Sequence, residues 1–226
     1  RGEFVPYAVN VSAGAEVPEI ARPFLPLCDK LGRLVTGLAG GAVRAIECRY
    51  LGRVGEVDTR VLTLAIVKGV LAGVVHEPVS FVNAPIIARE RGLEISEMRS
   101  SVSTDYVNLV SVRAETDDGP VSVSGTLVGK RERERIVEVN GYDIEMAPSP
   151  AMLFFFYEDR PGVIGAVGTA LGRHGINIAT MDVGRKAPGG TALMGLVLDS
   201  PVPAEVIAEI EQVIGAEAVR FVQLPE

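Results

Sequence analysis

The sequence predicts an α+β protein of two domains, and three observations lead to this prediction. Its 226 residues suffice for two domains of about 100 residues each. Hydrophobic residues make up 47% of the chain and charged residues 23%, a mixture that is typical of folded proteins and excludes intrinsic disorder. The segment Ala147-Pro148-Ser149-Pro150 holds the backbone extended, so we place a domain boundary there.

The residues after this boundary alternate between strand and helix patterns. A short apolar run is typical of a strand buried on both faces, and proline favours the first turn of a helix that glycines then end. The predicted elements are a strand at 152–157, a helix that Pro161 opens and Gly172 and Gly175 close, strands at 176–183 and 191–198 joined by a turn at 187–190, a helix after Pro203 and a strand at 219–222. Their order, β-α-β-β-α-β, is that of the ferredoxin-like fold.

The residues before the boundary predict a mixed, largely antiparallel sheet with helices. The elements are an extended segment at 4–11, a helix at 18–38 interrupted by Pro23 and Pro26, helices at 59–74 and 84–92 capped by Asp58 and Asn83, and strands at 42–50, 94–100, 107–115, 121–128 and 136–144. Hairpin turns are expected at 117–120 and 140–142.

Composition and missing motifs exclude several classes of function. The net charge of −7 argues against nucleic acid as the main partner, because phosphate backbones require clustered cations. Cys28 and Cys48 are too few for a disulfide framework, and no apolar run of about 18 residues predicts a membrane span. Nucleotide-binding and hydrolase motifs are missing, so we expect no catalytic residue and no metal site. The start at Arg1 has no initiator methionine or signal core, so we interpret the chain as a fragment, a processed product or a gene prediction that lost its beginning. We expect the protein to be cytoplasmic.

A binding site is predicted where the second domain's first helix begins. Asp159 stands just before this helix, so its carboxylate can receive an ammonium group while the first backbone amides receive a carboxylate. Asn177 stands at the start of the next strand, where its amide can both donate and accept. These groups describe a site for an α-amino acid. The alternative is that Asp159 only caps the helix and that Asn177 only fits a left-handed turn after Gly175.

A charged run at 130–135 is a second candidate site. If the run is extended, Arg131, Arg133 and Arg135 share one face, which could hold an anionic metabolite. The alternative, which we favour, is a solvated edge strand whose charges prevent aggregation.

Several of these stretches together resemble the C-terminal regulatory half of long-form D-3-phosphoglycerate dehydrogenase. The matching stretches are residues 4–11, 81–85, 89–92, 121–127 and 139–141, followed by Asp159-Arg160-Pro161-Gly162-Val163-Ile164-Gly165 and Gly175-Ile176-Asn177-Ile178. The last two form the signature of an ACT domain. The resemblance implies a core-exit segment and linker at 1–25, an intervening domain at 26–147 and an ACT domain at 151–226.

The resemblance also implies a role. The family is a cytoplasmic homotetramer that oxidises 3-phosphoglycerate with NAD in serine biosynthesis, and L-serine inhibits it by binding between the ACT domains of adjacent subunits. The NAD-binding and catalytic core of the family is not in these residues, so we expect no cofactor here and leave enzymatic activity open. The implied serine contacts are Tyr157, Asp159 and Asn177, with amides near Val163 and Ile164.

One departure from the family pattern and two alternatives accompany this hypothesis. Some relatives hold an anion in the intervening domain, but here only Arg135 is retained, while Tyr142, Asp143 and Ala147 stand at the other positions, which argues against such a site. The first alternative is an assembly module that senses no ligand. The second is a subunit of an iron–sulfur L-serine dehydratase, which ranks last because residues 4–11 resemble a dehydrogenase core exit.

Overall fold

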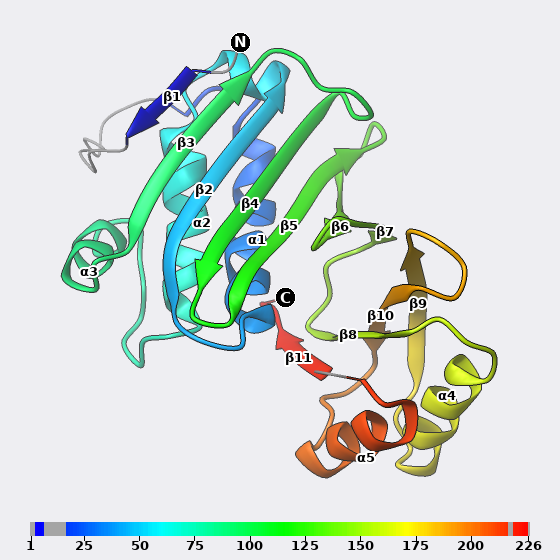
Figure 1. Cartoon of the computed structure of the whole chain (residues 1–226). Helices are drawn as coiled ribbons and strands as arrows, with labels where there is room; N and C mark the ends of the chain where they lie inside the picture. The colour runs from blue at the N-terminus through cyan, green and yellow to red at the C-terminus, as the bar shows by residue number, and fades with distance from the viewer. Residues whose placement is uncertain (1–2, 7–16, 217–218, 226) are drawn as a thin grey trace. The chain divides into compact units, whose positions relative to one another are not determined.

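The computed structural model describes residues 3–6, 17–216 and 219–225 (Figure 1). The chain forms two compact units, Arg1–Asn140 and Gly141–Glu226, here called unit 1 and unit 2. The division falls within a tight turn, where Asn140 and Gly141 both have positive φ, of 50° and 74°. The predicted extended segment at 4–11 is a strand at its start, while residues 7–11 lie outside the described residues.

Unit 1 is built on a mixed sheet with the strand order β1-β3-β2-β4-β5-β6. Its strands are β1 (Glu3–Pro6), β2 (Val43–Gly52), β3 (Glu94–Ser100), β4 (Asn108–Thr116), β5 (Gly119–Val128) and β6 (Arg133–Val139). β2 and β3 pair in parallel, and the other neighbours pair antiparallel. This confirms the predicted mixed, largely antiparallel sheet.

Two long helices, α1 (Leu25–Leu38) and α2 (Arg60–Ala72), lie side by side on one face of this sheet (Figure 1). Their backbones approach so closely that a Cβ on Gly69 would lie 2.0 Å from the carbonyl oxygen of Asp29. Only glycine fits such a crossing. Short 3₁₀ turns precede both helices, η1 (Arg22–Phe24) before α1 and η2 (Arg53–Glu56) before α2, and α3 (Ala84–Glu90) leads into β3.

The prolines and caps of unit 1 differ in detail from the prediction. Pro23 and Pro26 lie in η1 and in the first turn of α1, positions where proline's missing N–H is tolerated, so they start the helix and do not break it. Asp58 Oδ1 accepts from the backbone N of Arg60, 3.1 Å away. Asn83 precedes α3, but its Oδ1 accepts from the N of Ser80 and makes no bond to the helix.

Unit 2 begins with β7 (Tyr142–Met146) and continues as β8 (Ala151–Glu158), α4 (Val163–Arg173), β9 (Ile178–Arg185), β10 (Thr191–Leu198), α5 (Ala204–Ile214) and β11 (Val219–Gln223). The sheet order is β11-β8-β10-β9, with all neighbours antiparallel. This is the predicted ferredoxin-like arrangement. Its core lies between one face of the sheet and helices α4 and α5.

Turns account for two of the element boundaries that were predicted wrongly in the second half of the chain. The strand expected at 136–144 is two strands, β6 and β7, because the turn predicted at 140–142 is present and divides it at Asn140 and Gly141. The helix expected from Pro161 begins at Val163, because Gly162 has a φ of 94°, which no α-helix accommodates. Its end is as predicted: Gly175 has a φ of 70°, and the N of Ile176 donates to the carbonyl of Leu171 in a Schellman motif.

Candidate functional site

The predicted site in unit 2 is built around Asp159, the residue that follows β8. Its backbone N donates to the carbonyl of Gly190 at 2.8 Å, which fixes it beside the start of β10. Its Oδ2 accepts from Nη1 of Arg185 at 3.2 Å. The N-cap of α4 is Gly162, and no side chain caps this helix. The carboxylate of Asp159 therefore forms an ion pair and does not cap α4.

The start of α4 supplies backbone donors next to Asp159. The first intrahelical bond runs from the N of Ala166 to the carbonyl of Gly162, so the N–H groups of Val163 and Ile164 precede the helical ladder. The Val163 side chain is buried in the core, whereas 53% of Ile164 is exposed. The positive end of the helix dipole adds to the attraction that these amides exert on an anion.

Tyr157 and Arg185 stand in one row across the sheet of unit 2. Tyr157 on β8 pairs with Ala192 on β10, and Ala192 pairs with Arg185 on β9. Directly opposite residues share a face, and Tyr157 and Ala192 belong to the core under the helices, so Arg185 projects on that same face. Ala192 is the smallest member of the row and separates the phenol from the guanidinium.

The electrostatics of this row keep Tyr157 protonated. Burial raises the pKa of the Tyr157 phenol, the carboxylate of Asp159 raises it further, and the guanidinium of Arg185 opposes the rise. The phenol is therefore a neutral hydrogen-bond donor at physiological pH. This end of the sheet therefore offers neutral donors, from Tyr157 and the first amides of α4. It also offers an anion, Asp159, and a cation, Arg185.

Asn177 lies at the opposite end of the same sheet. Asp159 follows Glu158, which pairs with Thr191, whereas Asn177 precedes Ile178, which pairs with Leu198. Thr191 and Leu198 are the two ends of an eight-residue strand, so these ends are about 24 Å apart. One copy of the chain therefore does not bring Asp159 and Asn177 together.

The Asn177 side chain is held locally, although it does not adopt the left-handed turn that the alternative hypothesis required. Its Nδ2 donates to Oδ2 of Asp199 at 2.7 Å, and its carbonyl accepts from the N of Asp199. The left-handed residue of this loop is Gly175. The contact with Asp199 uses Nδ2 of Asn177 and not its side-chain oxygen.

The three arginines of the second candidate site do not share one strand face, because the run at 130–135 is not extended throughout. Arg131 precedes β6 in a turn where Glu132 has a φ of 49°, and only Arg133 and Arg135 lie on the strand. Glu134 is not solvated as predicted, because its Oε2 accepts from Nζ of Lys30 on α1 at 2.5 Å.

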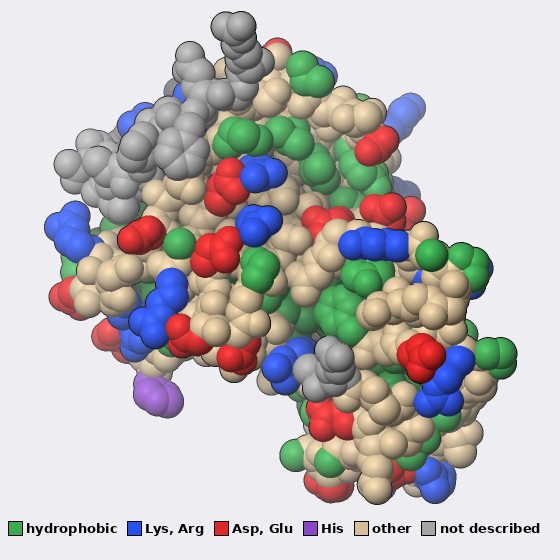
Figure 2. Space-filling view, viewed as in Figure 1, with side chains coloured by type: hydrophobic (Ala, Val, Ile, Leu, Met, Phe, Trp, Pro, Cys, Tyr) green, Lys and Arg blue, Asp and Glu red, His purple; other side chains and the backbone are tan. Residues whose placement is uncertain are grey.

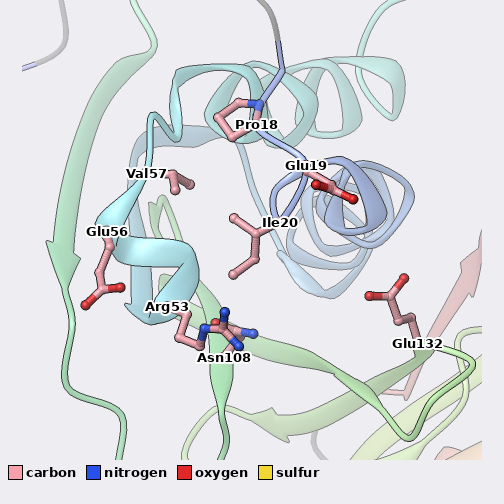
Figure 3. Close-up of a pocket in the computed structure, with 8 residues that line it drawn as sticks. All are labelled: Pro18, Glu19, Ile20, Arg53, Glu56, Val57, Asn108 and Glu132. Carbon is pink, nitrogen blue, oxygen red and sulfur yellow. The ribbon is translucent and has the colours of Figure 1, made fainter.

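Unit 1 contains a pocket of about 590 Å³ (Figure 3). Its lining residues are Pro18, Glu19, Ile20, Arg53, Glu56, Val57, Asn108 and Glu132. Carboxylates outnumber the single guanidinium, so its charge does not favour an anion. Asn108 has a structural role here, because its Oδ1 accepts from the backbone N of Val54 at 2.8 Å.

The described residues add three observations on function class. They contain no group of three or more His, Cys, Asp and Glu side chains placed to hold a metal ion. None of the helices among them has the length and apolar character needed to cross a membrane. Figure 2 shows basic and acidic side chains interspersed over the visible face, where they form no continuous basic surface among the described residues.

Arg185 is the ion-pair partner of Asp159 that the sequence analysis missed. The strand at 176–183 was ended two residues too early, which left Arg185 outside it. The predicted turn at 187–190 was enough to place Arg185 on the strand. A four-residue turn closed by Ala187 and Gly190 sets the register of the hairpin and puts residue 185 opposite residue 192.

Comparison with known proteins gives two family matches and a set of relatives. The D-3-phosphoglycerate dehydrogenase intervening domain matches residues 20–140, and the ACT domain matches residues 151–215. Proteins called D-3-phosphoglycerate dehydrogenase from Methanocaldococcus jannaschii, Synechocystis and Bacillus subtilis are 35%, 37% and 35% identical to this chain. The matches cover 99%, 96% and 100% of this chain but only 42%, 39% and 43% of those proteins. The chain thus spans about two fifths of the length of these curated relatives.

Proposed function

This chain belongs to the D-3-phosphoglycerate dehydrogenase intervening-domain family, and on that premise we propose that it is the regulatory and oligomerisation part of such an enzyme, with ACT domains that bind L-serine. The activity proposed for the whole protein is oxidation of 3-phosphoglycerate to 3-phosphohydroxypyruvate. NAD, the cofactor of that reaction, would be held outside these 226 residues. The proposed role of this chain is feedback inhibition by the end product.

The observation that carries the serine proposal is that Asp159 lies four residues before the start of α4 and that its carboxylate does not cap the helix but forms an ion pair. An α-amino acid carries an ammonium and a carboxylate on the same carbon. Asp159 attracts the ammonium, and the N–H groups of Val163 and Ile164 attract the carboxylate. The hydroxyl of Tyr157 is a further donor at the same end of the sheet.

Asn177 joins this site only if a second copy supplies it. β9 is the last strand in the sheet order of unit 2, and Asn177 and Arg185 stand at its two ends. A twofold axis beside β9 would reverse the partner strand and bring the Asn177 end of one copy to the Asp159 end of the other. A ligand shared in this way couples to subunit arrangement, and about 1–3 kcal/mol of coupling gives strong feedback.

Isothermal titration calorimetry with L-serine tests this function. We expect heat of binding in the wild-type protein, a rise in its melting temperature and a mass above that of the monomer. Asp159→Asn removes the proposed ammonium partner and is expected to weaken binding at least tenfold. Asp143→Asn removes the same charge from an exposed residue of unit 2 and should bind normally. Absence of heat with millimolar L-serine in the wild-type protein would refute the proposal.

A second candidate function is an assembly module that senses no ligand. The observation that favours it is the ion pair itself, because Arg185 already satisfies the Asp159 carboxylate. In that case the molecular mass from light scattering would be the same with and without L-serine, and it would be unchanged in Asp159→Asn. The dehydratase alternative has no such support, since the relatives compared above share the dehydrogenase name.

A further inference from the structure

We propose that Arg185 is a specificity-determining residue of the serine site, which joins the first amides of α4 in recognising the α-carboxylate of the effector while Asp159 recognises its α-ammonium. This inference rests on the proposed function of the site and extends it, because neither the sequence pattern nor the family resemblance assigned Arg185 a role.

The first support is the geometry of the Asp159–Arg185 ion pair. The contact joins Nη1 of Arg185 to Oδ2 of Asp159 at 3.2 Å. This is longer than the 2.7–2.9 Å usual for a charge-assisted N–H···O bond. The Asp159 side chain is 21% exposed and the Arg185 side chain 58% exposed. The guanidinium therefore reaches solvent beside a shielded carboxylate, and its planar fork has five N–H donors with which to bind a second anion.

The second support is the way in which the fold fixes Arg185. It is the last residue of β9, and the turn that begins at Ala187 returns the chain as β10. The resulting register places Arg185 opposite Ala192, whose methyl group is fully buried. This register holds the Arg185 guanidinium at the same end of the sheet as Asp159, with which it forms its ion pair.

The third support is the match between two pairs of charges. Asp159 and Arg185 form a dipole, and the head group of an amino acid forms another of similar length. When the two align head to tail, each charge meets its opposite, and the bond that Asp159 and Arg185 lose is replaced by two new ones. An amine without a carboxylate would break the contact between Asp159 and Arg185 but would offer the guanidinium no new anion to bind. The pair therefore selects α-amino acids over simple amines.

The inference is tested by comparing L-serine with L-serinamide, which keeps the ammonium and hydroxyl but has no carboxylate. Calorimetric titrations are made on the wild-type protein, Arg185→Gln, Arg185→Lys and the control Arg173→Gln. Arg173 is the matched control because it is also exposed and also pairs with a carboxylate, that of Glu209, but at the opposite end of α4. Melting temperatures establish that each variant is folded.

We expect the wild-type protein to bind L-serine at least tenfold more tightly than L-serinamide. Arg185→Gln should weaken L-serine binding about tenfold and leave L-serinamide nearly unchanged, so that the preference largely disappears. Arg185→Lys should restore part of the preference, because it keeps the charge but not the fork. Arg173→Gln should behave as the wild-type protein.

Three outcomes would overturn the inference, and they separate it from the proposed function. Tighter binding of L-serine by Arg185→Gln would make the guanidinium a competitor for Asp159. Equal weakening of both ligands would reduce Arg185 to a support for Asp159. In both cases the serine site itself would stand. A wild-type protein that binds neither ligand would refute the serine site and the role of Arg185 together.

Discussion

Each unit of this protein holds a shielded carboxyl group, but the two groups have different kinds of partner. In unit 1, Glu97 on β3 is only 7% exposed and accepts hydrogen bonds from the hydroxyls of Thr59 and Thr63. Thr63 is bonded in turn to the hydroxyl of Tyr50 at 2.7 Å. In unit 2, Asp159 is paired with one long contact to the half-exposed Arg185. The first carboxyl group is held mainly by neutral, buried hydroxyls, with Nε of Arg99 4.0 Å from its Oε1, whereas the second is paired with a half-exposed guanidinium.

The helices of the two units differ in the same way. Gly69 in α2 faces the backbone of α1, whereas Gly168 in α4 has no atom within 4 Å of the position where a Cβ would stand. Buried, closely packed groups stabilise a fold, because neither water nor a ligand can reach them and replace their contacts. Open groups next to a charge pair contribute little to stability and are available for binding. This contrast predicts four effects of decreasing size.

The largest effect is expected from Glu97→Ala. It leaves the buried hydroxyls of Thr59 and Thr63 without their acceptor and opens a cavity, so the free energy of unfolding should fall by about 3 kcal/mol. Urea denaturation followed by circular dichroism measures this. Glu94→Ala, at an exposed position of the same strand, is the control and should change stability by less than about 0.5 kcal/mol. Similar losses in the two variants would show that the Glu97 network is not a stabilising element.

Gly69→Ala should be the next most damaging change. Its Cβ would meet the carbonyl of Asp29 at 2.0 Å, so α1 and α2 must separate at a cost of about 2 kcal/mol. Gly168→Ala makes the same substitution in an open helix face and should raise stability by about 0.5–1 kcal/mol, because alanine favours helices. The same denaturation assay compares them. Destabilisation by Gly168→Ala would contradict the open surroundings of this position on α4.

Alkaline pH should act more strongly through unit 1 than through unit 2. Burial raises the pKa of the Tyr50 hydroxyl well above its ordinary value, and it raises that of Tyr157 less. The unfolded chain loses these protons near pH 10, so stability falls as pH rises above it, by up to about 1.4 kcal/mol per pH unit for each tyrosine. Tyr50→Phe should flatten this decline between pH 10 and 12 more than Tyr157→Phe does, when thermal unfolding is followed across that range. Equal slopes in the two variants would contradict the contrast in burial.

The smallest effect on stability is expected from Asp159→Asn. The ion pair is partly exposed and makes a single contact, so its loss should change the free energy of unfolding by no more than about 0.5 kcal/mol. Denaturation in urea measures this on the same samples that are titrated with L-serine. A large loss of stability would assign Asp159 to the fold, whereas unchanged stability with lost binding would assign it to the ligand.

Local sequence patterns were enough to predict most elements of both units. Alternating and helical spacing of apolar residues gave the four strands and two helices of the ferredoxin-like domain, and β10 was predicted to the residue. The misplaced boundaries have local causes. Gly162 takes a positive φ that delays α4, which the spacing of apolar residues does not reveal, whereas the turn predicted at 140–142 was not used to end the strand expected at 136–144.

The amino-acid sequence alone determined that a carboxylate stands before a helix start, because both features lie within a few adjacent residues. Only the tertiary structure decided what surrounds that carboxylate. Arg185 reaches Asp159 across 26 positions of the chain because the β9–β10 register places it there, and the same sheet puts Asn177 at the far end. Partners fixed by strand pairing depend on register, a property of the whole sheet, whereas caps and turns depend on neighbouring residues.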